Sequence, residues 1–410
     1  MSDAAPRYLD TADAVEQFLA ELGRPPAIAI DTEGASFHRF VDRIYLLQLS
    51  TAEHHAVIDP LPIGTPARLG ALLQDRGVEV VLHDADYDLR LLRQDYGWQV
   101  NALFDTRVAA QLLGLRAFGL AALLEQFFGI RLDKKHQRAD WSMRPLSADM
   151  LDYAALDTRW LLDLRATLRQ RLEQANRWHW AQEEFARAEG TQWNADDAGN
   201  AFLRLKGARD LTRRELARLR ELVQWRDEVA REIDRATFRV IGNETLLELA
   251  RSAPRAAGEL ARAKGFPRGM TEARQQGLLA ALRRGDAVPD AELPRFPKAP
   301  RWDRDPDFDD RVARLKAVRD SAAARLELDP GVLCSRERME AVARKQPRAL
   351  EEFEAIPELR RWQVEVLGEG FLRVLHPTGS TSAPSSATRT SSPSLAGSAP
   401  DDESPYRADD

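Results

Sequence analysis

Short apolar runs alternate with amphipathic stretches over the first 130 residues of the chain. Runs rich in β-branched residues predict strands, and apolar positions at helical spacing between them predict helices. The strands are expected at 27–31, 44–50, 56–58, 78–82 and, in a less regular run, 101–104, and the helices at 66–75, 86–96, 106–113 and 119–129. Three early strands followed by alternating strands and helices predict a mixed sheet flanked by helices.

Helical patterns dominate the rest of the chain. A longer helical stretch is expected from Ser147 to about Glu173, and strand signals almost vanish after Leu203. Residues 211–233 place their apolar residues in one stripe, with Thr212 in position to cap the helix. Shorter helices are expected at 244–251, 254–263 and 271–283.

Two helical blocks share a pattern of helix, Pro-Arg dipeptide and helix. The stretch LLELARSAPRAAGELARAKGF at 246–266 is echoed by MEAVARKQPRALEEFEAIPEL at 339–359. A Pro-rich, charged linker at 285–308 separates the blocks. The pattern predicts two small all-α modules, and the Ser, Thr and Pro residues after Pro377 predict a disordered acidic tail.

Composition narrows the class of protein. The chain has 410 residues, 44% of them hydrophobic, which is enough for two or three folded domains. Its N-terminus lacks the pattern of a signal peptide and no apolar run is long enough to span a membrane, so a cytoplasmic protein without a membrane partner is expected. The single cysteine, Cys334, cannot form an internal disulfide, so any metal must be held by oxygen or imidazole ligands.

The net charge of −6 is unevenly distributed. Residues 251–284 contain eight Lys or Arg residues and only two acidic ones, Glu259 and Glu272. Because phosphate binding depends on the local field, the overall acidity does not exclude a nucleic acid as partner.

Acidic residues recur in three short windows. Asp31 and Glu33 end an apolar strand and point to the same face, Asp88 lies where a strand gives way to a helix, and Tyr153 and Asp157 share one helix face. Hard oxygen ligands of this kind suit Mg²⁺ and Mn²⁺. Each window also has an ordinary explanation: a solvated strand end, an aspartate at a helix N-terminus, and a core tyrosine beside an exposed aspartate.

Together these windows resemble those of the DEDD exonuclease superfamily in its tyrosine subclass, and more closely those of the bacterial ribonuclease D family. The resemblance is carried by IAIDTEG at 28–34, VVLHDADYDL at 80–89, FDTRVAAQLLG at 104–114 and LDKKHQRADWSMRPLSADMLDYAALD at 132–157. The helical repeats resemble HRDC domains, and the likeness covers about residues 5–375. It implies an α/β ribonuclease H-like exonuclease domain at 1–200, all-α HRDC-like domains at 205–288 and 306–376, and the tail at 377–410.

The resemblance also implies roles for the residues of the three windows. Asp31, Glu33, Asp88 and Asp157 would bind two divalent cations, Mg²⁺ or Mn²⁺, and Tyr153 would lie beside the attacking water. His83 lies five residues before Asp88, which matches the family's spacing and favours Asp88 over Asp84 and Asp86 as the ligand.

Substrate contacts are less defined by the resemblance. Many members of the family have Phe directly after the DTE triplet and Arg two residues later, whereas Gly34 and Ser36 stand here, so Phe37, His38, Arg39 and Phe40 are alternative sources of stacking and phosphate contacts. We further expect substrate binding by His83, Lys134, Gln137, Trp141 and Arg144, with an anchoring role in the core as the alternative for Trp141.

The expected function is that of a metal-dependent 3′-5′ exoribonuclease. The resemblance implies release of 5′-mononucleotides from RNA with a single-stranded 3′ end, with tRNA precursors as substrates and the chain acting as a monomer. A 3′-5′ DNA exonuclease and a non-catalytic RNA-binding scaffold remain the alternatives. Zinc, serine and cysteine hydrolase motifs are absent from the sequence, as is a phosphate-binding GxxxxGK[ST] loop.

Overall fold

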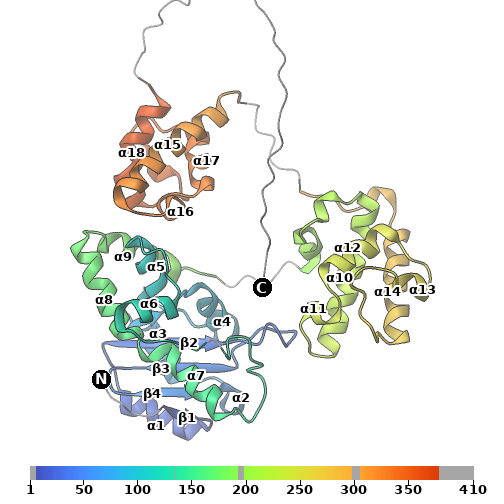
Figure 1. Ribbon diagram of the computed structural model, residues 1–410, viewed down its shortest axis with the longest axis horizontal. Helices are drawn as coiled ribbons and strands as arrows, with labels where there is room; N and C mark the ends of the chain where they lie inside the picture. Colours follow the sequence, from blue (N-terminus) through green and yellow to red (C-terminus); the bar gives the residue numbers. More distant parts are fainter. Residues whose placement is uncertain (1–5, 134, 193–197, 298–304, 378–410) are drawn as a thin grey trace, which may run out of the picture.

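The computed structural model describes residues 6–133, 135–192, 198–297 and 305–377 (Figure 1). The predicted disordered tail therefore lies, from residue 378 on, outside the described residues. The described chain forms a sheet domain (residues 6–192), a first helical module (198–292) and a second helical module (308–375).

The sheet domain is built on six strands in the order β1-β4-β3-β2-β5-β6. β3 runs antiparallel to both of its neighbours, and the other pairs are parallel, so the predicted mixed sheet is confirmed. The strands are β1 (Arg7–Leu9), β2 (Ala27–Glu33), β3 (Leu46–Ser50), β4 (His55–Ile58), β5 (Glu79–Leu82) and β6 (Leu103–Asp105). Only β1, three residues long, was not predicted, because so short a strand carries no alternation.

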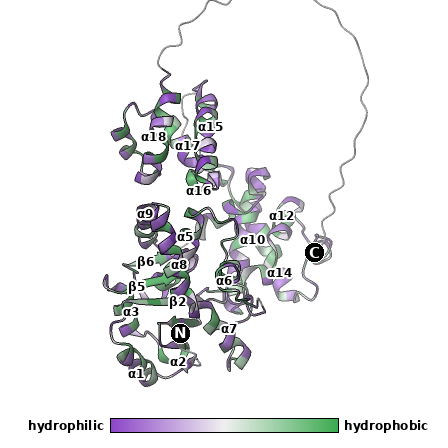
Figure 2. Cartoon of the chain, turned by 60° about the vertical axis from the view of Figure 1, so that its left-hand side comes forward, coloured by the Kyte–Doolittle hydropathy of each residue, from purple (hydrophilic) through white to green (hydrophobic). Residues whose placement is uncertain are grey.

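Helices cover the sheet on both sides. They are α1 (Ala12–Leu22), α2 (Pro60–Ile63), α3 (Ala67–Gln74), α4 (Asp86–Tyr96), α5 (Thr106–Leu112), α6 (Leu120–Phe128), α7 (Ala148–Arg159), α8 (Leu161–Gln174) and α9 (Trp178–Glu189). The strands between them consist mostly of buried apolar residues, among them Ile28, Ile30, Val80 and Val81 (Figure 2). This burial on both faces explains why the strand runs are apolar throughout.

The helical stretch expected at 147–173 is confirmed, but it consists of two helices, α7 and α8. The chain breaks at Trp160, whose φ of −104° and ψ of 0° leave the helical region. The break changes direction, so that α7 packs over β2, β3 and β4 whereas α8 packs over β2 and β5. This change of direction places Tyr153 and Asp157 of α7 over the sheet.

The first helical module has its own core. Its elements are η1 (Ala198–Arg204), η2 (Ala208–Asp210), α10 (Arg213–Glu232), α11 (Thr237–Val240), α12 (Asn243–Ser252), α13 (Ala257–Leu260), α14 (Glu272–Ala287) and η3 (Asp290–Glu292). Thr212 caps α10 as predicted, in a capping box with Glu215. The apolar stripe of α10, including Leu219, Leu222 and Val229, is buried against α12 and α14.

The second helical module shares its core with the sheet domain. It consists of α15 (Phe308–Leu326), α16 (Pro330–Leu333), α17 (Arg336–Lys345), η4 (Leu350–Ala355) and α18 (Arg361–Leu375), and it lies next to α9 and α5 (Figure 1). Trp362 stacks on Trp180 of α9 with ring centroids 4.8 Å apart. One continuous apolar cluster runs from the sheet into α15, α17 and α18. Within the described chain, no helix combines the length and the apolar sequence needed to cross a membrane.

Candidate active site

Three carboxylates converge at the end of β2. Asp31 and Glu33 lie two residues apart on this central strand, so their side chains point to the same face. α7 packs over that face and brings Asp157 to them. One oxygen from each of the three side chains lies within 4.8 Å of the others, which is close enough for a shared cation.

Asp88 lies behind this cluster, in the first turn of α4. It is 5% exposed, and its Oδ1 accepts hydrogen bonds from the backbone N–H of Thr32, at 3.0 Å, and from the Thr32 hydroxyl. The neighbouring Asp84 and Asp86 are exposed and pair with Arg107 and Arg90. Of the three aspartates in this window, only Asp88 therefore faces the cluster.

Burial and mutual repulsion raise the pKa of these carboxyl groups. Burial is the largest cause for Asp31, followed by the charges of Asp88, Asp157 and Glu33, and its pKa lies well above the ordinary value. The pKa of Glu33 is raised for the same reasons, by burial and then by Asp157 and Asp88. Burial raises the pKa of Asp157 to about 7, and burial also raises that of Asp88 to about 7 against the hydrogen bonds from Thr32.

This donor set fits a divalent cation. Carboxylates crowded in a poorly hydrated place must either take up protons or bind a positive charge. The charges that act on Glu33 are those of other carboxylates, so the cluster carries an excess of negative charge. Three oxygen ligands within 4.8 Å match the chemistry of Mg²⁺ or Mn²⁺. The cluster is thus a candidate metal site.

Tyr153 stands one helical turn before Asp157 on α7. Burial, and then the charges of Asp157, Glu33 and Asp31, raise the pKa of its hydroxyl well above 10. Because the group stays protonated, it can donate a hydrogen bond but cannot serve as a base at neutral pH. Its ring lies 6.1 Å from that of Trp141 and 5.7 Å from that of His136, measured between centroids.

A pocket of about 200 Å³ opens beside Tyr153 and Asp157. Lys135 and His136 also line it, from the segment that precedes α7. The Nε2 atom of His136 is buried and has no hydrogen-bond partner among the described residues, so a ligand's polar group could satisfy it. Both residues lie in the polar stretch that carries the family resemblance.

The residues that the sequence predicts to bind substrate differ in burial and in their distance from the pocket. His83 is part-buried, its Nδ1 lies 2.9 Å from the Thr106 hydroxyl, and burial lowers its pKa to about 4, so it is neutral at pH 7. Gln137 is exposed on the segment next to the pocket. Lys134 lies outside the described residues.

Two of those residues are part of the protein's own framework. Trp141 is 1% exposed and packs under Tyr153, so the anchoring alternative fits it and its ring offers no face to a substrate. Arg144 pairs with Asp59 and donates to the carbonyl oxygens of Tyr45 and Trp141. Its guanidinium is held by these groups of the protein.

The loop after β2 shows what surrounds Gly34, which stands where many family members have phenylalanine. A Cβ atom at this position would lie 2.1 Å from the Tyr87 hydroxyl, so a larger residue would require the Tyr87 side chain to move. That hydroxyl donates to Asp42, at 2.7 Å. Tyr87 thus occupies the space beside Glu33 that a larger residue at position 34 would need.

Residues 37–40 of the same loop reach the first helical module (Figure 1). Arg39 forms an ion pair of 3.1 Å with Asp234, and the backbone N–H of Phe40 donates to the same carboxylate. Because the partners lie almost 200 residues apart, the sequence carried no signal for this contact.

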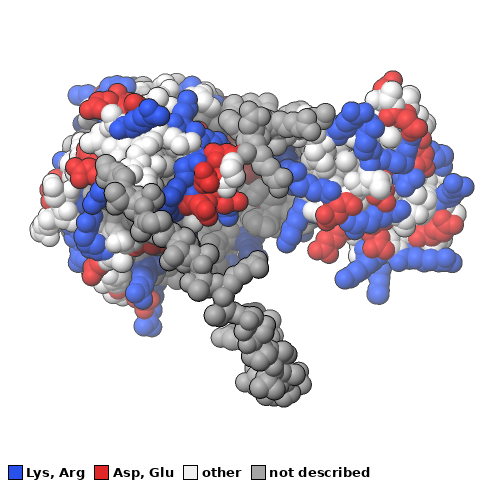
Figure 3. Space-filling view, turned by 90° about the horizontal axis from the view of Figure 1, so that it is seen from above, with Lys and Arg blue, Asp and Glu red and all other residues white. Residues whose placement is uncertain are grey.

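The basic stretch of the first helical module lies on its surface. Seven of its cationic side chains are exposed, namely Arg251, Arg255, Arg262, Lys264, Arg268, Arg283 and Arg284. Lys and Arg side chains cover much of the visible face of this module (Figure 3). The surface suits a polyanion.

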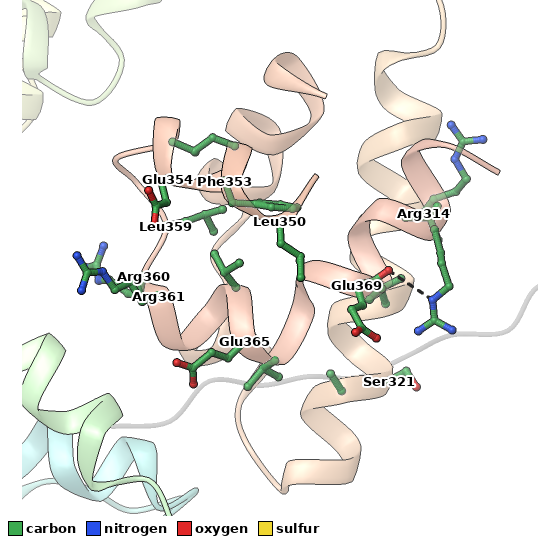
Figure 4. A pocket seen from close by; sticks show the side chains of 18 of the residues that line it. Arg314, Ser321, Leu350, Phe353, Glu354, Leu359, Arg360, Arg361, Glu365 and Glu369 are labelled. Atoms are coloured by element: carbon green, nitrogen blue, oxygen red, sulfur yellow. Dashed lines mark hydrogen bonds between the residues drawn. The ribbon is translucent and has the colours of Figure 1, made fainter. Parts of the chain in front are cut away.

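A larger cavity lies elsewhere, mainly in the second helical module. It measures about 1290 Å³ and is lined by α15, η4 and α18 (Figure 4). Arg314, Arg361 and Arg373 share its wall with Glu354, Glu365 and Glu369. It lies away from the carboxylate cluster, and its lining mixes five arginines with four glutamates.

Comparison with known families agrees with this division of the chain. Residues 6–173 match the 3′-5′ exonuclease family, and residues 215–282 and 308–375 each match the HRDC domain. The ribonuclease D of Acidiphilium cryptum is 32% identical over 372 residues, which cover 90% of this chain and 93% of that protein.

Two solved structures are similar over most of the chain. The crystal structure of Escherichia coli RNase D, described as an exoribonuclease involved in structured RNA processing, has a TM-score of 0.69 at 26% identity and covers 91% of this chain and 99% of that one. A protein from Bifidobacterium adolescentis has a TM-score of 0.76 at 27% identity and covers 91% of this chain and 97% of its own.

Proposed function

The chain belongs to the ribonuclease D family of 3′-5′ exoribonucleases, and from this premise we propose that it removes nucleotides singly from single-stranded RNA 3′ ends, releasing 5′-mononucleotides. Transfer-RNA precursors are the proposed natural substrates. The proposal rests above all on the approach of Asp31, Glu33 and Asp157 within 4.8 Å, beside the Tyr153 pocket.

We propose that the site works with two divalent cations, Mg²⁺ or Mn²⁺. Asp31, Glu33 and Asp157 would hold them, and Asp88 would complete the set. When bound, such cations activate a water molecule and stabilise charge on the phosphate and the leaving oxygen. The raised pKa values of the carboxyl groups support this assignment, because cations would replace the protons that the cluster otherwise retains.

The protein's own groups would position the reactants. The Tyr153 hydroxyl, kept protonated, would donate a hydrogen bond that orients the attacking water. Lys135 and His136 would contact the terminal nucleotide in the pocket, where the buried Nε2 of His136 lacks a protein partner among the described residues. Because every one of these groups comes from one chain, we propose that the monomer is active.

We propose that the exonuclease domain spans 1–200 and the HRDC domains 205–288 and 306–376. The exposed cations of 251–284 would then lie on the first HRDC domain and draw the RNA backbone toward the enzyme. This arrangement supports RNA with a structured body and a free 3′ end as substrate.

The test uses 3′-labelled and 5′-labelled single-stranded RNA and DNA with Mg²⁺, with Mn²⁺ and with chelator. We expect metal-dependent release of 5′-mononucleotides from RNA in preference to DNA. Asp31→Asn should abolish release, whereas Asp86→Asn, a matched change of an exposed aspartate, should not. Preference for DNA would favour a repair-type exonuclease, and binding without cleavage would favour a scaffold.

A further inference from the structure

Two phenylalanines meet at the surface where the sheet domain contacts the first HRDC domain. Phe37 lies on the loop after β2, and Phe238 lies on α11. Their ring centroids are 6.3 Å apart with an interplanar angle of 75°. Even so, Phe37 is 47% exposed and Phe238 is 51% exposed, so about half of each residue stays accessible to solvent.

The contact between the domains does not depend on these rings. The carbonyl oxygens of residues 37 and 38 accept hydrogen bonds from the Arg239 side chain and from the backbone N–H of Ala236, respectively. Phe40 packs against the apolar core of the first HRDC domain, and Arg39 pairs with Asp234. Since these groups hold the domains together, the protruding rings need another explanation.

Guanidinium groups accompany both rings. The Arg138 guanidinium lies 5.6 Å from the centre of Phe37, and that of Arg239 lies 5.7 Å from the centre of Phe238. Both arginines are exposed, and no ion pair engages Arg138 within the part of the chain that the structure describes. Aromatic faces with adjacent cations form the surface that binds single-stranded nucleic acid, through base stacking and phosphate contact.

The rings are connected to the active site through the chain itself. Phe37 follows Glu33 by four residues, and its neighbour His38 contacts the Arg138 carbonyl oxygen at 3.1 Å. The segment that carries Arg138 begins at the pocket, where His136 faces Tyr153. A strand with its 3′ end at Tyr153 could therefore follow this segment toward α11.

We propose that Phe37 and Phe238, with Arg138 and Arg239, form a stacking platform for the single-stranded RNA upstream of the 3′ end. The inference rests on the proposed function and adds a binding site shared between two domains. The rings stack on one or two bases, the Arg138 guanidinium contacts a phosphate between them, and Arg239 keeps Phe238 beside Phe37 through its hydrogen bond to the residue 37 carbonyl oxygen. Because every base has an aromatic face, the platform accepts any sequence.

The experiment measures binding of a 12-nucleotide RNA to the full chain in the presence of chelator, so that no cleavage occurs. A 2-aminopurine placed at successive positions from the 3′ end reports stacking through loss of its fluorescence. Phe37→Leu and Phe238→Leu keep an apolar side chain at the contact but remove the ring, and Phe37→Trp keeps a stacking surface. Arg138→Gln tests the cation, and Leu61→Ala, an apolar residue of α2 that is 39% exposed, is the matched control.

We expect each leucine variant to weaken RNA binding on the order of tenfold and to restore fluorescence at one or two positions. Phe37→Trp and Leu61→Ala should bind as the wild type does, and Arg138→Gln should weaken binding. Wild-type affinity and quenching in both leucine variants, with RNA still hydrolysed by the wild type on adding Mg²⁺, would overturn the platform alone. A wild type that neither binds nor hydrolyses RNA would overturn the proposed function and the platform together.

Discussion

Thr32 holds Asp88 at the back of the carboxylate cluster. The backbone N–H and the hydroxyl of Thr32 both donate to Asp88 Oδ1, the former at 3.0 Å, so the residue between Asp31 and Glu33 fixes the carboxylate of α4. The side chains of β2 alternate between the two faces of the sheet. Asp31 and Glu33 point toward Asp157, and Thr32 between them contacts Asp88. These hydrogen bonds stabilise the ionised form of Asp88 and oppose the rise in its pKa caused by burial.

Removal of the Thr32 hydroxyl should therefore weaken the metal site without emptying it. We expect Thr32→Val to raise the Mn²⁺ concentration needed for half-maximal activity about 10- to 100-fold, the range found when partners of metal ligands are removed. Thr32→Ser keeps the hydroxyl and should restore the response. Titration of activity with Mn²⁺ measures this, and an unchanged midpoint in Thr32→Val would show that the backbone N–H alone positions Asp88.

The metal-free protein should lose stability as pH rises from about 4 to about 7. The pKa of Asp157 is raised to about 7, so in this window the folded state holds a proton that the unfolded state, with an ordinary carboxyl group, has released. The free energy of unfolding then falls with pH, by about 1.4 kcal/mol per unit of pKa difference, and levels off above pH 7.

Asp157→Asn should remove part of the dependence of the unfolding free energy on pH. In chelator, the variant should melt at a higher temperature than the wild type at pH 8 and at a similar temperature at pH 4. Mn²⁺ should raise the melting temperature of the wild type at pH 8 but have little effect on the variant. Parallel melting curves for the two proteins at all pH values would contradict the raised pKa.

Tyr153→Phe should slow catalysis while the fold stays intact. The ring packs against Trp141 and His136, and phenylalanine keeps these contacts. Loss of a hydrogen bond to a charged or reacting group costs about 1.5–3 kcal/mol, so kcat should fall roughly ten- to a hundredfold with little change in KM.

Because the pKa of Tyr153 lies well above 10, the wild type should show no loss of activity from its ionisation up to about pH 10. An ionisation below pH 9 that disappears in Tyr153→Phe would refute this assignment.

The carboxylates were predictable from the sequence because their signals are local. Asp31 and Glu33 are two residues apart on a strand, and Tyr153 and Asp157 are four apart on a helix, so periodicity alone gives the shared face. The resemblance then selects Asp88 from three aspartates, and the structure shows why: Asp84 and Asp86 face solvent. The sequence signal for the N-cap at Thr212 was also local, because it lies within one helical turn.

Contacts between distant segments were not predictable. Arg144 looked like a phosphate ligand because it lies in a basic stretch, yet its partner Asp59 lies 85 residues away. In the sequence, Trp362 is one more apolar position of a predicted helix. No nearby residue in the sequence indicates that Trp180 covers it. The same holds for Phe37 and Phe238. Hydrophobic pattern predicts that a side chain is buried, whereas the identity of the covering segment depends on the tertiary fold.

The basic face of the first HRDC domain should contribute to RNA affinity mainly through charge. Reversal of the exposed Arg262, Lys264 and Arg268 to glutamate should weaken binding at low salt and reduce its salt dependence, by about 0.7 in the logarithmic slope for each phosphate that the protein no longer neutralises. Reversal of Arg68, Arg131 and Arg336, exposed residues of the other domains, changes the net charge equally and is the control. Equal slopes in both variants would mean that only the net charge matters.

The second HRDC domain and the exonuclease domain should unfold together, because they share one apolar core. Trp362 is 1% exposed, stacks on Trp180 and donates from its indole N–H to Glu184 at 3.0 Å. Trp362→Ala should lower the free energy of unfolding by about 3–5 kcal/mol, since it leaves a large cavity between the two domains.

Trp362→Phe is the milder change, because phenylalanine still stacks on Trp180, and the losses are the hydrogen bond to Glu184 and part of the buried ring volume. That carboxylate keeps Arg360, whose Nε lies 3.0 Å from it, so the decrease in unfolding free energy should be about 1–2 kcal/mol. Urea titrations followed by circular dichroism and by residual exonuclease activity should give the same midpoint in each protein, and both midpoints should fall together in Trp362→Ala. If activity kept its wild-type midpoint while the helical signal shifted, the two domains would be thermodynamically separate and the shared core would not couple them.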